Sequence, residues 1–220
     1  MSTANINIGI IGSGIVARVL GTAFLLEGYQ VMVGSRTPDK AELVKWQGNK
    51  LEAKLGTFAE ATAFGNIIVL AIKGTAIMEA IQQAGKENFA GKTIIDATNP
   101  IADAPPVNGV LPYFTGPGDS LMEQVQRLLP DAHLVKAFNS VGNAQFYKPA
   151  YAQGKPTMFI CGNNENAKQT VTNILYAFGW ETADMGTAEA ARAIEPLAML
   201  WCILGFTKNQ WGHAFKLLIP

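Results

Sequence analysis

The chain has 220 residues, enough for one large domain with its own buried core, or for one domain with a small appendage. Hydrophobic residues make up 49% and charged residues 15%, which excludes an intrinsically disordered chain. Because 17 Lys and Arg balance 17 Asp and Glu, we expect neither nucleic-acid binding nor a polybasic membrane anchor. Arg18 is the first charged residue, so the N-terminus lacks the basic segment of a secretory signal.

The sequence contains no pattern typical of a metal site or of a membrane-spanning helix. Cys161 and Cys202 have no metal-binding or redox spacing, and we expect no metal site. The apolar run 196–206 falls short of the about 20 residues that span a bilayer. We therefore expect a cytoplasmic protein that does not act at a membrane.

Strand-like and helix-like segments alternate along the chain, which is typical of a parallel sheet covered by helices. The sequence predicts strands at residues 6–11, 29–33, 67–72, 93–97, 134–138, 157–161 and 182–185. It predicts helices at residues 15–27, 38–46, 57–64, 75–85, 120–129, 165–178 and from 187 almost to the end. The proline-rich segment 101–119 is expected to be a long functional loop.

The first strand ends in a glycine-rich turn that opens the first helix. Its residues Gly12, Ser13, Gly14, Ile15, Val16 and Ala17 follow the pattern G-x-G-x-x-A. Gly12 allows a tight turn, and Gly14 lets a pyrophosphate approach the backbone at the helix N-terminus. The sequence thus predicts an α/β fold of the Rossmann type, doubly wound and mostly parallel. We assign residues 1–142 to a nucleotide-binding domain and 143–220 to a smaller αβ and helical region packed on it.

The end of the second strand indicates which dinucleotide binds. An NAD site places an acidic residue here, whereas this chain has Ser35 and Arg36, with Lys40 nearby. A hydroxyl and two cations suit the 2′-phosphate of NADP. We therefore expect NADP(H) to bind.

Other strand ends should meet at the same edge of the sheet, where open α/β sheets bind ligands. Ala71, Ile72 and Lys73 close the central strand and should run beside the nicotinamide ribose. Lys73 could contact a substrate or face solvent. From the two strands that follow, we expect cofactor contacts at these residues: Asn99, Pro100, Ala137 and Asn139.

Acid–base constellations are sparse in this sequence. His133 and His213 are more typical of structural positions, and Gly154 and Pro156 break any helix around the Tyr151-x-x-x-Lys155 pattern. No catalytic residue is therefore assigned. Asn139 and Ser140 are candidates for orienting the reacting ring. The apolar stretch 197–206 is long enough to cover that ring, and the alternative is that it packs onto the sheet.

Taken together, the motifs resemble the NADP reductases that use the deazaflavin coenzyme F-420. The resemblance rests on these segments and covers nearly the whole chain in order: GIIGSGIVARVLG, VGSRTPDK, VLAIKGTA, DATNP, LVKAFNSV, FICGNN and ARAIEPLAMLW. The cytosolic reductase domain of membrane ferric reductases is similar too. The resemblance implies hydride transfer between NADP(H) and a deazaflavin or flavin ring, with the phosphate turn on 13–16 and residues 137–141 bordering the nicotinamide.

This chain departs from the family pattern next to the expected reaction centre. Asn139, Ser140 and Val141 replace a His and an Ile-Pro turn, and Ile72-Lys73 replaces a second Ile-Pro. The acceptor therefore stays open between a deazaflavin, a flavin, a ferric chelate and a small carbonyl compound. The alternatives are a small imine or 3-hydroxyacid-type reductase, or an NADPH-binding regulatory module without turnover. We expect a homodimer.

Overall fold

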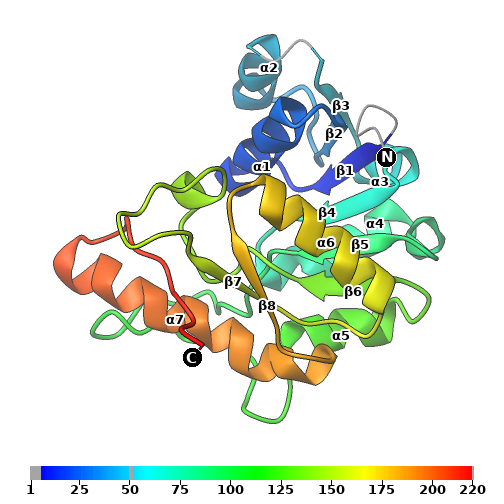
Figure 1. The fold of residues 1–220 in the computed structure, drawn as a ribbon. Helices are drawn as coiled ribbons and strands as arrows, with labels where there is room; N and C mark the ends of the chain where they lie inside the picture. The colour runs from blue at the N-terminus through cyan, green and yellow to red at the C-terminus, as the bar shows by residue number, and fades with distance from the viewer. Residues whose placement is uncertain (1–5, 50–51, 220) are drawn as a thin grey trace.

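The computed structural model describes residues 6–49 and 52–219 and contains a six-stranded, fully parallel sheet (Figure 1). Its strands are β1 (Asn7–Ile11), β2 (Gln30–Gly34), β3 (Lys54–Gly56), β4 (Ile67–Leu70), β5 (Thr93–Asp96) and β6 (His133–Lys136). They lie in the order β3-β2-β1-β4-β5-β6. Successive strands are added on one side of β1 and then, from β4 on, on its other side, so the topological switch point lies between β1 and β4. The predicted Rossmann-type, doubly wound fold is confirmed.

Helices cover both faces of the sheet, as parallel sheets require. They are α1 (Ile15–Leu26), α2 (Ala41–Gly48), α3 (Phe58–Phe64), α4 (Ile77–Ala84), α5 (Leu121–Leu128), α6 (Glu165–Ala177) and α7 (Ala191–Lys208). α1 and α6 pack with Ile8 and Val135 on one face, whereas α3, α4 and α5 pack with Ile68 and Leu134 on the other. The β-branched strand residues thus separate two apolar layers.

A second, two-stranded parallel sheet of β7 (Thr157–Ile160) and β8 (Glu181–Asp184) extends the molecule beyond β6. An antiparallel bridge between Lys136 and Cys161 joins the two sheets. The apolar core is continuous across residue 142: the ring centroids of Phe24 and Phe178 lie 5.1 Å apart, and those of Phe138 and Phe146 lie 5.3 Å apart. The C-terminal region is therefore packed on the nucleotide-type unit.

Three local predictions were wrong. The helix expected at 38–46 begins at Ala41. The Ser35 hydroxyl oxygen accepts a hydrogen bond from the Thr37 amide, and this bond holds the segment before the helix in a turn. Strand β3 was not predicted, since its three residues are too few to show a pattern. The last helix does not reach almost to the end: Asn209 adopts the left-handed conformation and ends it after Lys208.

α7 is the longest helix in the described part of the chain and is largely apolar. Together with the short turn before it, it covers 188–208, which is long and apolar enough by length and composition to cross a bilayer. Buried core helices pass the same test, and α7 buries Ala191, Ile194, Ala198 and Trp201. Figure 1 shows this helix, in orange to red, lying alongside the domain.

Candidate functional site

The turn between β1 and α1 is shaped by two glycines under different constraints. Gly12 has a φ of +122°, and a Cβ there would lie 2.2 Å from the carbonyl oxygen of Ala71. Gly14 caps α1, and a Cβ there would meet nothing within 4 Å. No described side chain caps this helix, so its first N–H groups have no side-chain partner there. Such an arrangement suits an anion.

Hydroxyls and cations gather at the carboxyl end of β2. The Ser13 and Ser35 hydroxyl oxygens lie 3.1 Å apart, and the amide of Thr37 donates to Ser35 Oγ over 3.1 Å. Ser35 is buried, whereas Arg36 is exposed and Lys40 stands at the start of α2. The structure thus brings the predicted 2′-phosphate residues to the edge of the glycine turn.

Arg18 was missed by the sequence reasoning and lies beside this cluster. Its Nη1 atom is 4.0 Å from a carboxylate oxygen of Glu42 on α2, and the Nε atom is buried without a hydrogen-bond partner among the described residues. Arg18 comes directly after Ala17, the last residue of the G-x-G-x-x-A pattern, so the pattern gave no reason to single it out. Its guanidinium adds positive charge between α1 and α2.

The end of β4 passes directly behind the glycine turn. Ala71 donates its amide to the Ile11 carbonyl over 2.9 Å, and Ile72 is half-buried. Lys73 is exposed and forms an ion pair with Asp103 on the long loop. The Lys73 ammonium thus joins the loop 101–119 to the strand end.

A cavity of about 420 Å³ opens at the carboxyl ends of β5 and β6. Val16 from the glycine turn lines it together with Asn99 and Asn139. The remaining lining residues are mostly apolar or aromatic and come from the segments after β5 and β6 and from the C-terminal region: Ala97, Ile101, Phe138, Val141, Gly142, Asn143, Ala144, Phe146, Ala198, Trp201, Cys202 and Trp211. Ala137 and Ser140 are buried nearby but do not line the cavity, and Pro100 is buried in the loop base.

A pair of asparagines joins the two strand ends at this cavity. Asn99 Nδ2 donates to the Asn139 carbonyl over 2.8 Å, and Asn139 Nδ2 donates to Asn99 Oδ1 over 3.2 Å. Asn139 Nδ2 also donates to the Ile194 carbonyl of α7 over 3.0 Å. β5, β6 and α7 are thereby fixed relative to one another.

A buried ionic cluster lies next to the asparagines. Lys136 Nζ is 2.7 Å from Asp96 Oδ2, 2.8 Å from Glu195 Oε1 and 3.0 Å from the carbonyl of Thr98, and the three charged side chains are at most 2% exposed. Glu195 also accepts the first amides of α5 from Leu121 and Met122, both over 3.0 Å. Burial alone would lower the pKa of Lys136, but the two carboxylates outweigh it and raise that pKa.

Aromatic residues form one wall of the cavity, and sequence reasoning found only part of this wall. Phe138 adopts a φ of +62°, an unusual backbone for a bulky residue and one found where a fold fixes a functional site. The rings of Trp201 and Trp211 lie with centroids 5.4 Å apart. Trp201 and Cys202 of the apolar stretch 197–206 line the cavity, while Ala191 and Ile194 of the same helix pack into the core. No sequence pattern marked Phe146 or Trp211.

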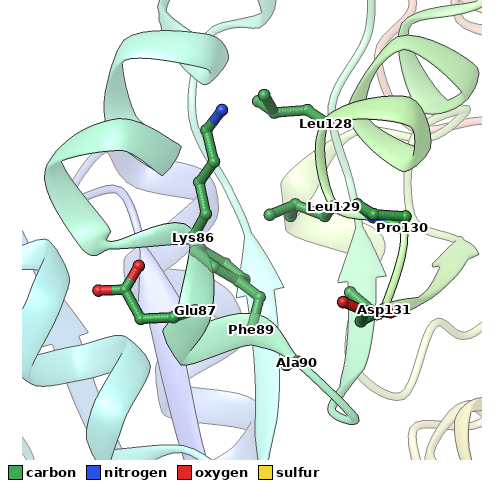
Figure 2. A pocket seen from close by; sticks show the side chains of 9 residues that line it. Lys86, Glu87, Phe89, Ala90, Leu128, Leu129, Pro130 and Asp131 are labelled. Atoms are coloured by element: carbon green, nitrogen blue, oxygen red, sulfur yellow. The ribbon is translucent and has the colours of Figure 1, made fainter.

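A smaller cavity, of about 140 Å³, lies at the opposite edge of the sheet. Figure 2 shows Leu128 and Leu129 facing Lys86 and Phe89 across it. These residues belong to the segments that precede β5 and β6, so the cavity sits at the amino ends of the strands. Parallel α/β sheets bind their ligands at the other edge, and we place no part of the site here.

Comparisons with known proteins agree with this geometry. Residues 7–100 match the family described as NADP oxidoreductase, coenzyme F420-dependent. The F420-dependent NADP reductase of Methanocaldococcus jannaschii is 26% identical over 208 residues, which cover 88% of this chain and 89% of that protein. The rat metalloreductase STEAP3 is 30% identical over 196 residues, but this chain spans only 37% of its length.

A solved structure supports the same relation. A protein from Arthrobacter sp. FB24, provisionally described as an F420-dependent NADP reductase, superimposes with a TM-score of 0.91 at 29% identity, covering 98% of this chain and 100% of that one. The fold, the glycine turn and these relatives make the chain similar to NADP-dependent oxidoreductases. Within that class, the predicted resemblance to the reductases that use coenzyme F420 is confirmed.

Proposed function

We propose that the protein transfers a hydride between NADP(H) and an acceptor with a flat ring system, and that the preferred acceptor is a deazaflavin. The observation that carries this proposal is the 420 Å³ cavity, which extends from Val16 of the phosphate turn to Trp201 and Trp211. A dinucleotide whose pyrophosphate lies on the N-terminus of α1 would place its nicotinamide ring in this cavity. The aromatic wall leaves a site suited to a second ring.

NADP is favoured over NAD by the residues at the end of β2. The Ser13 and Ser35 hydroxyls point toward one another, and Arg36 remains exposed and available for a phosphate. Arg36 can form charge-assisted hydrogen bonds to the 2′-phosphate, and Lys40 can add a second positive charge. A ribose 2′-hydroxyl would leave this positive charge without a partner.

The composition of the cavity favours a ring acceptor over a carbonyl or an imine. Reducing a carbonyl or imine needs a proton donor at the reacting atom. Among the described residues that line the cavity, Cys202 is the single titratable side chain, and burial raises the pKa of its thiol. The asparagines, tryptophans and phenylalanines can orient and stack rings but supply no proton, which suits direct exchange between two cofactors.

NADPH oxidation with a panel of acceptors tests the proposal. The bound nucleotide supplies the hydride, and the panel contains a deazaflavin, a free flavin, a ferric chelate and a cyclic imine. We expect turnover with the deazaflavin to exceed that with the imine by at least about tenfold. Faster turnover with the imine would refute the ring-acceptor assignment.

A binding module without turnover is the second candidate. The long loop 101–119, held by the Lys73–Asp103 pair, exposes Val107 and Phe114 and could serve a partner as easily as a substrate. This alternative predicts tight NADPH binding by calorimetry with no oxidation by any acceptor of the panel. The two functions therefore separate in the same pair of assays.

A further inference from the structure

Asn139 carries an unused hydrogen-bond acceptor at the wall of the large cavity. The residue is 5% exposed and lines that cavity. Both amide hydrogens are committed, one to Asn99 Oδ1 and one to the Ile194 carbonyl. Asn139 Oδ1 is buried and has no hydrogen-bond partner among the described residues.

The orientation of this amide follows from its partners. Turning the amide over would place Oδ1 against the oxygens of Asn99 and Ile194, so two hydrogen bonds would become two repulsive contacts. The group that remains free for a ligand is therefore an acceptor. Buried acceptors are nearly always paired in folded proteins, and an unpaired one at a ligand site selects for a ligand that brings a donor.

We propose that Asn139 Oδ1 accepts a hydrogen bond from the carboxamide N–H of the nicotinamide ring. This inference rests on the proposed NADP(H) function. Val16, the last residue of the phosphate turn, lines the same cavity, so a nucleotide anchored at that turn would reach Asn139 with its nicotinamide end. The carboxamide is the amide N–H donor on that ring, and its hydrogen bond would fix the ring against the strand end of β6. The same N–H chemistry occurs in the imide of a flavin or deazaflavin.

Nucleotide analogues test the contact without changing the protein. We would measure dissociation constants by calorimetry for NADP⁺, its thionicotinamide analogue, which keeps the amide N–H, and its 3-acetylpyridine analogue, which replaces the NH₂ by a methyl group. We expect NADP⁺ and the thio analogue to bind alike and the acetyl analogue to bind about tenfold more weakly. Equal binding of all three would overturn the inference and leave the proposed function intact. Failure of NADP⁺ itself to bind would overturn both.

Two variants assign the effect to this atom. In Asn139→Ala the acetyl analogue should lose its disadvantage, because the acceptor is gone. Asn143→Ala, which changes another amide of the same cavity, should retain the tenfold difference. If Asn139→Ala does not fold, the wild-type analogue series decides the question. Equal analogue binding together with weaker turnover of an N3-methylated flavin would instead assign Oδ1 to the acceptor's imide and contradict the nicotinamide contact.

Discussion

The buried ionic cluster offers the sharpest test of how the site is held together. Replacing Lys136 by Met keeps the length of the side chain but leaves Asp96 and Glu195 as two buried carboxylates without their shared cation. Removing one partner of a buried ion pair costs about 3–5 kcal/mol. A domain of this size has a total stability of about 5–15 kcal/mol, so the variant should be strongly destabilised but measurable.

The same figure predicts a thermal shift. At about 2–4 °C per kcal/mol for a protein of this length, Lys136→Met should lower Tm by about 6–20 °C. Urea unfolding followed by circular dichroism would measure the free energy directly. Glu195→Gln is the control, since it leaves the Lys136–Asp96 pair in place and should cost less than Lys136→Met. A loss below 1 kcal/mol in Lys136→Met would refute the view that this cluster fixes β5, β6 and α7.

The remaining predictions concern the nucleotide and the acid range. Arg36→Ala removes a charge-assisted contact worth about 1.5–3 kcal/mol, so fluorescence titration should show NADPH weakened about 10- to 150-fold and NADH barely affected. Gly14→Val should abolish NADPH binding in calorimetry, because the side chain would occupy the space of the pyrophosphate. Its dichroism spectrum should stay normal, because a Cβ at Gly14 meets nothing in the protein, whereas Gly12→Ala should perturb the fold itself. The hydrogen bonds from Arg192 hold the pKa of Glu123 below its usual value, so this pair stabilises the fold above the unfolded pKa and is lost as pH falls through the folded one. Glu123→Gln should lower the free energy of unfolding at pH 7 by only about 1 kcal/mol, because Arg192 is partly exposed and the pair is screened. Urea unfolding at several pH values should show that this variant loses less stability in acid, because it no longer carries the carboxylate.

Local patterns predicted the parts of the site that lie close together in sequence. The turn around Gly12 and Gly14 has a spacing that only a few backbone geometries satisfy, and the structure has that geometry. Ser35 and Arg36 follow a strand that was predicted at 29–33 and is observed at Gln30–Gly34. The carboxyl-end rule for parallel strands then placed Asn99 and Asn139 near one another, and their side chains do bond.

Long-range features left no comparable signal. Lys136, Asp96 and Glu195 come from two strands and a helix, and each alone resembles an exposed charge until the fold buries it. Lys136 was predicted only as part of a strand. Its burial follows from the bridge to Cys161, which places a further strand beside β6.

Local turn chemistry explains the errors near the nucleotide site. Thr37 and Pro38 are residues typical of a helix start, but the Thr37 amide donates a hydrogen bond to the Ser35 hydroxyl in a turn instead. The segment 35–40 therefore stays open at the edge of the sheet, which leaves Arg36 exposed. Ser35, whose hydroxyl suits a phosphate, is thus also the reason that α2 begins only at Ala41.

Transfer of an isotope from NADPH to the acceptor tests the central proposal most directly. NADPH carrying deuterium at the transferred position of C4 would be mixed in ordinary water with the protein and a deazaflavin, and the oxidation followed in a stopped-flow instrument. We expect rapid loss of the nicotinamide absorbance and recovery of the deuterium on the ring carbon of the reduced acceptor. NADPH that binds but is not oxidised, or a label that appears in water, would contradict direct hydride transfer in this cavity.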